Sequence, residues 1–281
     1  MDLNQLRINS LDRKKVLLYG PPKSGKTALA GALANEGFTL YWCDLENGIN
    51  TLFNPNVLKE ENRKNVNYIR IPDYKEYPIA IDTVRSLVKS GKQRVCFEHG
   101  AVECVKCKVI PDAKWSELDI SALGEKDILV IDSLTQLGLS AINKILKPQI
   151  MSKGDNVEIE WTDYRKQGMA LDTVLSRLQA APINCIVISH ETDVEKDEKK
   201  TKLAPTSGTA NYSKTVGKYF DELVYVTVLN GKHRAYNSTT YSNTVQSGGR
   251  SGVIIDSLEV PSLVPIFCPD KLAEYTKRKA T

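Results

Sequence analysis

The chain has 281 residues, of which 41% are hydrophobic and 26% are charged, close to the averages for soluble globular proteins. A chain of this length can bury a full core without disulfides or a metal. Its formal net charge of +4 neither favours nor excludes nucleic acid binding. No apolar run approaches the roughly 18 residues of a membrane helix, and no apolar stretch indicates a secretory signal. We therefore expect a cytoplasmic protein without a membrane partner, whose six cysteines are core residues or metal ligands rather than disulfides.

Short apolar runs rich in β-branched residues alternate with helical patterns along most of the chain. The first five runs are mostly continuous rather than alternating, which is typical of strands buried on both faces of a parallel sheet. The predicted strands cover residues 16–19, 39–43, 68–71, 128–131, 185–189, 223–229 and 233–237. The predicted helices include residues 27–36, 78–90 and 164–180. This alternation predicts an α/β fold with a mostly parallel central sheet.

The end of the chain shows a different pattern. Asn230 and Gly231 separate the last two predicted strands, and this dipeptide is a strong signal for a type I′ hairpin. We therefore expect a C-terminal antiparallel hairpin beside the parallel strands. Residues 148–156 and 192–208 have the polar composition of loops. Because no stretch has the composition of an interdomain linker, residues 1–281 are predicted to form a single domain with insertions.

A glycine-rich segment joins the first predicted strand to the first predicted helix. It matches G-x-x-x-x-G-K-[ST], in the strand-to-helix context that this phosphate-binding motif requires. The segment is Gly20, Pro21, Pro22, Lys23, Ser24, Gly25, Lys26 and Thr27. Backbone N–H groups of such a loop surround phosphate oxygens. Lys26 would reach the β- and γ-phosphates and Thr27 would hold Mg²⁺, so the segment predicts ATP and Mg²⁺ as ligands.

Acidic residues follow two other predicted strands. Asp132 ends the apolar run at 128–131, where P-loop proteins carry a Mg²⁺-binding carboxylate. Hydrolysis also needs a group that orients or deprotonates water. Glu46 follows the run at 39–43, and if that strand neighboured the first, its carboxylate would face the γ-phosphate. A loop acid or helix cap explains Glu46 equally well, and Asp44 is a rival in the same segment.

His190 follows the predicted strand at 185–189. A polar side chain at this edge could sense the γ-phosphate and signal to the next segment, although a purely structural histidine fits the pattern too. That next segment mixes Lys199, Lys200 and Lys202 with acidic residues. Such a mixture is typical of a solvated loop, and it also suits a mobile DNA-binding loop that becomes ordered when ATP binds.

Three of the six cysteines fall within twelve residues, beside a histidine. Cys96, His99, Cys104 and Cys107 follow the spacing C-x₂-H-x₄-C-x₂-C, and two close pairs of such ligands suit tetrahedral Zn²⁺. Because no coordination position would stay open, the site is predicted to be structural. We expect a small zinc-knuckle insertion over residues 94–110, with incidental cysteines in a reduced hairpin as the alternative.

Together these segments resemble the RecA-like ATPases, in particular the compact phage and prophage nucleotide-binding proteins related to single-strand annealing ATPases. The likeness covers residues 14–256 as separated motifs. These are GPPKSGKT for the phosphate loop, DLENG for the strand-end acid, VIDSLT for the Mg²⁺-binding strand, VISHE for the sensor and GGRSG for a C-terminal basic motif. The resemblance implies a RecA-like fold in which Glu46 is the general base and His190 is the sensor.

The resemblance also implies partners. The segment after His190 would contact single-stranded DNA, and Lys214 and Lys218 alternate downstream with tyrosines, a mixture that suits phosphate contact and base stacking. ATP would lie between the subunits of a homo-oligomer, with a basic residue supplied in trans. Arg250 is the candidate for that residue, and Lys218 and Arg234 are its rivals, although a surface arginine in a glycine-rich turn explains Arg250 at least as well. No large additional DNA-binding domain is evident, so DNA binding or annealing is expected rather than strand exchange.

The sequence thus predicts a Mg²⁺-dependent ATPase that binds single-stranded DNA in recombination or replication of a phage or mobile element, in the cytoplasm of a bacterial host. Two other classes stay open. A nucleotide-gated assembly or loader protein would show little turnover. A P-loop small-molecule kinase would share the phosphate loop but need an acceptor pocket and a basic lid.

Overall fold

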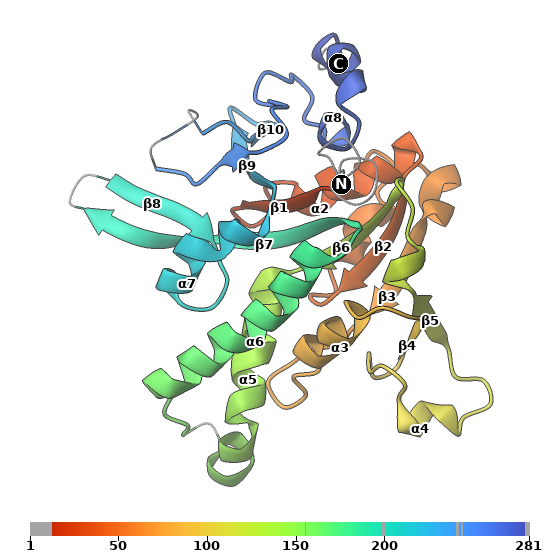
Figure 1. Ribbon diagram of the computed structural model, residues 1–281, viewed down its shortest axis with the longest axis vertical. Coiled ribbons are helices and arrows are strands. Elements are labelled where there is room, and N and C mark those ends of the chain that lie inside the picture. Colours follow the sequence, from red (N-terminus) through yellow and green to blue (C-terminus); the bar gives the residue numbers. More distant parts are fainter. Residues whose placement is uncertain (1–12, 155, 198–199, 240–241, 243, 279–281) are drawn as a thin grey trace, which may run out of the picture.

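A nine-stranded, mostly parallel β-sheet forms the centre of the protein (Figure 1). The structure is a computed structural model that describes residues 13–154, 156–197, 200–239, 242 and 244–278. Its strands are β1 Lys15–Gly20, β2 Thr39–Asp44, β3 Val66–Arg70, β6 Asp127–Asp132, β7 Asn184–Asp197, β8 Lys200–Pro205, β9 Glu222–Leu229, β10 Lys232–Tyr236 and β11 Gly248–Gly249. They lie in the order β10-β9-β1-β7-β6-β2-β3, with β8 paired to β7 and β11 paired to β9.

Helices cover both faces of this sheet (Figure 1). The helical segments are α2 Lys26–Gly31, η2 Ala32–Glu36, η3 Ile49–Phe53, η4 Glu60–Asn65, α3 Ala80–Leu87, α4 Val105–Lys108, η5 Ile120–Ala122, α5 Leu134–Lys153, α6 Trp161–Ala180, α7 Ala210–Thr215, η6 Val216–Tyr219, α8 Val264–Phe267, η7 Pro269–Lys271 and α9 Leu272–Thr276. No helix in the described ranges has the length and apolar character needed to cross a bilayer.

Two hydrophobic cores lie on the two faces of the sheet. α3, α5 and α6 contribute to one core, whereas α2, α8 and α9 contribute to the other. Along β1, Leu17 belongs to the first core and its neighbours Val16 and Leu18 belong to the second, because successive side chains of a strand point to opposite faces. This double burial explains why the strands are continuous apolar runs, as the sequence predicts.

The strand order does not place β2 beside β1, which is the condition under which the sequence directs Glu46 at the γ-phosphate. β7 pairs with β1, and β6 lies between β7 and β2. The chain that follows β1 therefore crosses to the far side of β6 before it forms β2. Since all four strands are parallel, their carboxyl ends still lie along one edge of the sheet. Ligands of open α/β sheets bind at that edge.

The prediction of a loop at residues 192–208 is wrong for much of its length. β7 continues to Asp197 and pairs antiparallel with β8, forming a hairpin that extends away from the central sheet (Figure 1). The register shifts between Asp193 and Glu195. Main-chain hydrogen bonds and the β-branched Thr192 and Val194 therefore outweigh the charge-rich composition of this segment.

The prediction of a loop at residues 148–156 is also wrong in its first part. α5 continues through Pro148 and ends at Lys153. Proline removes one N–H donor and disfavours a helix interior. Here α5 packs along α6, and this tertiary contact outweighs the local cost of the proline.

The C-terminal hairpin predicted from Asn230 and Gly231 is confirmed. β9 and β10 pair antiparallel, and the two turn residues have φ angles of 52° and 75°. A type I′ turn requires positive φ at both of these positions. Because β9 also pairs with β1, the hairpin belongs to the sheet that carries the phosphate loop.

A small second sheet is inserted between β3 and β6. β4 Gln93–Cys96 and β5 Trp115–Leu118 pair antiparallel, and α4 lies between them in the chain. Gly100 has a φ of 61°, and a Cβ there would come within 2.6 Å of Pro72. The Thr83 hydroxyl donates to the Gly100 carbonyl oxygen at 2.6 Å. These close contacts hold the insertion against the segment after β3 and against α3.

Candidate functional site

The phosphate loop connects β1 to α2 at the carboxyl edge of the sheet. Gly20 ends β1, and a Cβ there would lie 2.0 Å from the Val226 carbonyl oxygen of β9. Gly25 has a φ of 96°, which residues with side chains rarely adopt. Both glycines of the motif are therefore required by the path of the loop. Pro22 and Lys23 are exposed at its tip.

Lys26 begins α2, and its side chain reaches back along the loop. Its Nζ donates to the carbonyl oxygens of Gly20 at 3.0 Å and Pro21 at 2.7 Å. Burial lowers the pKa of Lys26 to about 8, and the Asp132 carboxylate partly opposes this shift. The side chain borders a cavity of about 340 Å³. The cavity is lined by Lys23, Gly25, Lys26, Thr27, Ala28, Glu46, Thr51, Asp132, Ser133, Ile188, Ser189 and His190.

A pair of oxygen ligands suitable for a divalent cation lies in this cavity. The Thr27 hydroxyl donates to Asp132 Oδ2 at 3.1 Å. Burial, together with the nearby carboxylates of Glu46 and Asp44, raises the pKa of Asp132 to about 7. Mg²⁺ prefers hard oxygen ligands, and a hydroxyl and a carboxylate both provide them. Nearby positive charge does not fully compensate the negative charge of the buried Asp132 carboxylate. Thr27 and Asp132 could hold this ion beside the phosphates.

Glu46 enters the cavity from the loop after β2. One carboxylate oxygen accepts a hydrogen bond from the Ser133 hydroxyl, and the other lies 3.5 Å from His190 Nε2. Burial tends to raise the pKa of Glu46, but the contacts with His190 and Ser133 outweigh it and lower the pKa below its usual value. The carboxylate is therefore ionised at neutral pH, as a group that accepts a proton from water must be.

The role of Asp44 differs from that of Glu46, two residues further along the chain. Its buried carboxylate accepts backbone hydrogen bonds from Glu46 at 3.2 Å, Gly48 at 3.0 Å and Ile49 at 3.3 Å. The Tyr68 hydroxyl donates to it at 3.2 Å. Asp44 thus fixes the loop, whereas Glu46 lines the cavity. This geometry favours Glu46 over Asp44 as the residue that contacts water.

His190 connects the cavity to the base of the β7–β8 hairpin. Its backbone N–H donates to the Thr135 hydroxyl at 3.0 Å, and its carbonyl oxygen accepts from the Thr206 N–H at 2.7 Å. The Ser189 hydroxyl donates to the Thr206 carbonyl oxygen at 2.8 Å. A displacement of His190 would therefore be transmitted to the residue that directly follows β8.

Sequence reasoning missed the hydroxyl groups that join these side chains. The Ser133 hydroxyl contacts Glu46, while the hydroxyls of Thr135 in the first turn of α5 and Ser189 within β7 lie 3.3 Å apart. All three are within three residues of Asp132 or His190 in the sequence. The signal that could have identified these hydroxyl groups is their place near the carboxyl ends of predicted strands, because in a parallel sheet these ends lie along one edge.

Three of the lysines considered for DNA binding line one open groove. Lys202 of β8, Lys214 of α7 and Lys218 of η6 surround a volume of about 690 Å³. Within the described part of the chain, the lining of this groove contains no carboxylate. Lys199 lies outside the described residues. Lys200 begins β8, but its side chain also lies outside what the structure describes.

Arg250 lies far from the cavity of its own chain. β11 pairs with the first residues of β9, so Arg250 follows at the amino edge of the sheet. Its Nη1 lies 3.8 Å from Asp221 Oδ1, and its backbone N–H donates to the Asp221 carbonyl oxygen at 2.9 Å. Arg250 therefore lies away from the nucleotide site of its own chain, and its contacts with Asp221 are also those of an ordinary surface arginine.

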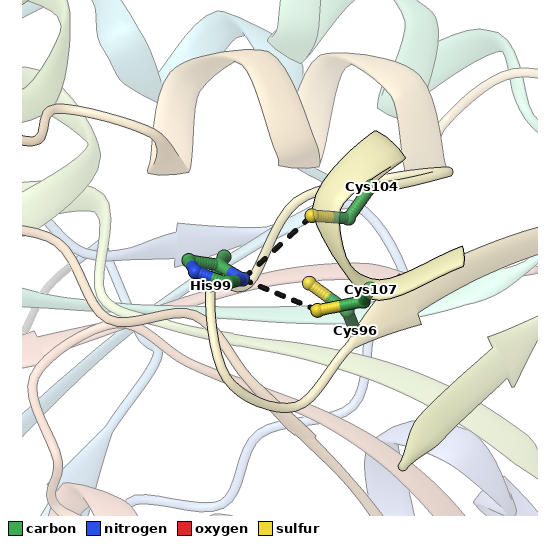
Figure 2. A group of neighbouring side chains, drawn as sticks. All are labelled: Cys96, His99, Cys104 and Cys107. Carbon is green, nitrogen blue, oxygen red and sulfur yellow. Dashed lines mark hydrogen bonds between the residues drawn. The ribbon is translucent and has the colours of Figure 1, made fainter. Parts of the chain in front are cut away.

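The four zinc ligands predicted from the sequence converge in the insertion. Cys96 at the end of β4, His99 in the following turn, and Cys104 and Cys107 around α4 point toward one another (Figure 2). Their ligand atoms all lie within 4.8 Å of one another, and His99 Nδ1 lies 3.2 Å from Cys107 Sγ and 3.7 Å from Cys104 Sγ. Three sulfurs and one imidazole nitrogen at this spacing could hold a tetrahedral zinc ion.

The insertion contacts the segment that carries Glu46 through β3. The ring of Tyr68 packs edge-on against Phe97, with centroids 6.4 Å apart, while the Tyr68 hydroxyl donates to Asp44. Arg70 Nη1 donates to the Phe97 carbonyl oxygen at 3.1 Å. β3 therefore links the cysteine cluster to the loop that positions Glu46.

A known protein family matches most of the chain. The family model described as AAA domain matches residues 12–251. The chain belongs to the AAA domain family. Membership makes it a P-loop ATPase domain that binds nucleotide, in agreement with the cavity at the carboxyl edge of the sheet. A search of curated proteins found no match.

The buried carboxylate of Asp132 should reduce the stability of this AAA domain when it ionises. Its pKa of about 7 in the folded state lies above the usual value of an aspartate carboxyl group, so the folded state retains the proton more strongly than the unfolded chain. The wild-type protein should therefore lose stability relative to Asp132→Asn as the pH rises from about 4 to about 7, with a constant difference above that range. Thermal unfolding with a metal chelator at pH 5 and pH 8 tests this. The same difference in melting temperature between the two proteins at pH 5 and at pH 8 would contradict it.

Proposed function

We propose that this AAA domain is a RecA-like, Mg²⁺-dependent ATPase that binds single-stranded DNA in recombination or replication of a phage or mobile element. The observation that carries the proposal is the continuous set of contacts from the cavity to the β7–β8 hairpin. Glu46 contacts His190, and the backbone of His190 is hydrogen-bonded to Thr206 at the end of that hairpin. Such an arrangement allows the state of the nucleotide to alter a DNA-binding element.

ATP hydrolysis follows from the side chains in the cavity. Lys26 exchanges its bonds to loop carbonyls for phosphate oxygens. Mg²⁺, held by Thr27 and Asp132 when bound, supplies positive charge to the β- and γ-phosphates. Glu46 accepts a proton from the attacking water as the water oxygen bonds to the γ-phosphorus. The bond between that phosphorus and the β–γ bridging oxygen breaks, and ADP leaves with the electron pair.

His190 is proposed to report this change to the hairpin. Its Nε2 lies 3.5 Å from the Glu46 carboxylate, so proton uptake by Glu46 or departure of the γ-phosphate changes the charge that it faces. The side chain and backbone of His190 cannot move independently over large distances. Because Thr135 and Thr206 bind its backbone, a shift of His190 changes the angle at which the hairpin leaves the sheet.

The lysine-lined groove beside this hairpin is the proposed path of DNA. Leu203 of β8 donates its N–H to the Thr244 carbonyl oxygen at 2.7 Å, so the hairpin forms one wall of the groove together with the segment around residue 244. Lys202, Lys214 and Lys218 would contact phosphates, a mode of binding that requires no particular base sequence. An open groove of one charge suits the flexible backbone of a single strand.

The proposed assembly is a homo-oligomer with ATP between subunits. Arg250 at the amino edge is exposed, and its guanidinium lies at the opposite edge of the sheet from its own phosphate loop. In a head-to-tail arrangement, the amino edge of one copy faces the carboxyl edge of the next. Arg250 would then contribute positive charge to the γ-phosphate bound by a neighbouring copy.

The cysteine cluster is proposed to hold one structural Zn²⁺. Cys96 and Cys107 are buried, and all four ligand positions are filled by protein groups. A closed Cys₃His site of this kind contributes folding free energy rather than a reactive metal. The ion would keep α4 and the turn at His99 in place, and thereby support the contacts of Phe97 with β3.

Single-stranded DNA should stimulate ATP hydrolysis by the wild-type protein more than double-stranded DNA or RNA does. The triple variant Lys202→Ala, Lys214→Ala, Lys218→Ala should bind single-stranded DNA about tenfold or more weakly, because it loses three phosphate contacts, and should show a shallower dependence of affinity on salt. ATPase assays and fluorescence anisotropy at several salt concentrations measure both effects.

Lys59→Ala, Lys89→Ala, Lys126→Ala is the matched control, since it removes the same charge from exposed positions outside the groove. Equal loss of DNA affinity in both triple variants would contradict the assignment of the groove.

Phosphate transfer to a small acceptor would instead identify a kinase. ATP-dependent oligomerisation without affinity for DNA would identify an assembly or loader protein.

Chelator-washed protein should contain about one equivalent of zinc per chain. Cys104→Ser should lose the metal and melt at a lower temperature, because the remaining three ligands no longer close the site. Cys268→Ser is the control, since Cys268 lies outside the cluster, and it should retain zinc. Metal analysis by mass spectrometry together with thermal unfolding provides the measurement. A Cys104→Ser protein with normal stability and no zinc in either form would exclude the structural role.

A further inference from the structure

The outer side of the phosphate loop is contacted by a residue that no motif includes. His233, the second residue of β10, places its Nδ1 2.7 Å from the carbonyl oxygen of Ser24. A carbonyl oxygen can only accept a hydrogen bond, so Nδ1 of His233 carries the hydrogen and donates it. The contact joins positions 209 residues apart in the chain.

The imidazole ring also packs directly against Gly25. A Cβ built on Gly25 would lie 2.9 Å from His233 Nδ1 and 3.2 Å from Cε1. The second glycine of the motif is thus needed for two reasons, the positive φ of the loop and the approach of this ring. His233 therefore limits the space on one side of the Ser24–Gly25 peptide.

The geometry of the peptide bond turns this outside contact into an effect on the cavity. The carbonyl of Ser24 and the N–H of Gly25 belong to the same planar trans peptide, so they point in opposite directions. His233 holds the carbonyl from outside the loop, while Gly25 lines the cavity on the inside. Rotation of this peptide would require the hydrogen bond to break.

The sheet itself holds His233 in place. His233 pairs with Val228 across the β9–β10 hairpin, and β9 pairs with β1, which leads into the phosphate loop. The type I′ turn at Asn230 and Gly231 sets the register of the hairpin just before His233. The donor and the loop that it contacts are therefore positioned by the same rigid element.

We propose that His233 is a positioning residue for nucleotide binding, which holds the Ser24–Gly25 peptide with the Gly25 N–H directed at a phosphate oxygen. A loop that is already in its binding conformation does not have to lose conformational freedom when the phosphates arrive. The inference rests on nucleotide binding by the phosphate loop, and it needs neither DNA binding nor the zinc site.

His233→Ala should weaken binding of Mg²⁺–ADP and Mg²⁺–ATP by about three- to tenfold, the effect of one hydrogen bond of typical strength. His233→Asn should bind nucleotide almost as tightly as the wild type, because the amide nitrogen of asparagine takes a position close to Nδ1. His233→Gln places its amide further out, near Nε2, and should behave like the alanine variant. KM for ATP should rise in the two weakened variants while kcat changes less than twofold.

Calorimetric titration with ADP and Mg²⁺, together with steady-state kinetics, distinguishes these outcomes. Leu229→Ala is the control, since Leu229 lies in the same hairpin and is exposed on the opposite face from Val228, the residue that pairs with His233. It should leave nucleotide affinity unchanged. Unchanged affinity in His233→Ala, or equal losses in the alanine, glutamine and asparagine variants, would overturn the proposal. Failure of the wild-type protein to bind nucleotide would refute the ATPase assignment instead.

Discussion

The hydrogen bond from the Thr27 hydroxyl to the Asp132 carboxylate joins the two halves of the site on which the rest of the structure depends. The two residues are 105 positions apart. Thr27 is the second residue of α2, and Asp132 is the last residue of β6. β7 lies between β1 and β6, so this hydrogen bond spans the width of β7. His190 is the residue of β7 that pairs with the end of β1. The parallel sheet thereby brings the phosphate loop, a buried carboxylate and a histidine into one cavity.

The balance of charge in this cavity explains why its acidic residues have different roles. Asp44, Glu46 and Asp132 lie near a single buried lysine, Lys26. Asp44 is held by backbone N–H groups, and contacts with His190 and Ser133 lower the pKa of Glu46. Within the described ranges, the one hydrogen-bond donor to the Asp132 carboxylate is the Thr27 hydroxyl, and burial raises the pKa of Asp132 to about 7. Asp132 is therefore the carboxylate whose negative charge is least compensated, and it is the one that a bound cation would stabilise most.

Local patterns were sufficient to predict the phosphate loop, the hairpin at Asn230-Gly231 and the four ligands of the cysteine cluster, because each depends on residues close in sequence. The place of β2 beyond β6, the β7–β8 hairpin and the contact of His233 with Ser24 were not predictable in this way. Each depends on how distant segments pair across the sheet. The charge-rich composition after His190 indicated a loop, whereas main-chain pairing produces two strands there.

The role of Glu46 is tested most directly by comparing ATP binding and hydrolysis in the same variant. Glu46→Gln should bind about one ATP per chain with near wild-type affinity, while kcat falls by about 10² or more, because the amide cannot accept the proton of the attacking water. Lys26→Ala should lose binding as well as turnover. Single-turnover hydrolysis and equilibrium binding of ATP in the presence of Mg²⁺ measure the two properties separately. An unchanged kcat in Glu46→Gln would contradict the mechanism and require another base.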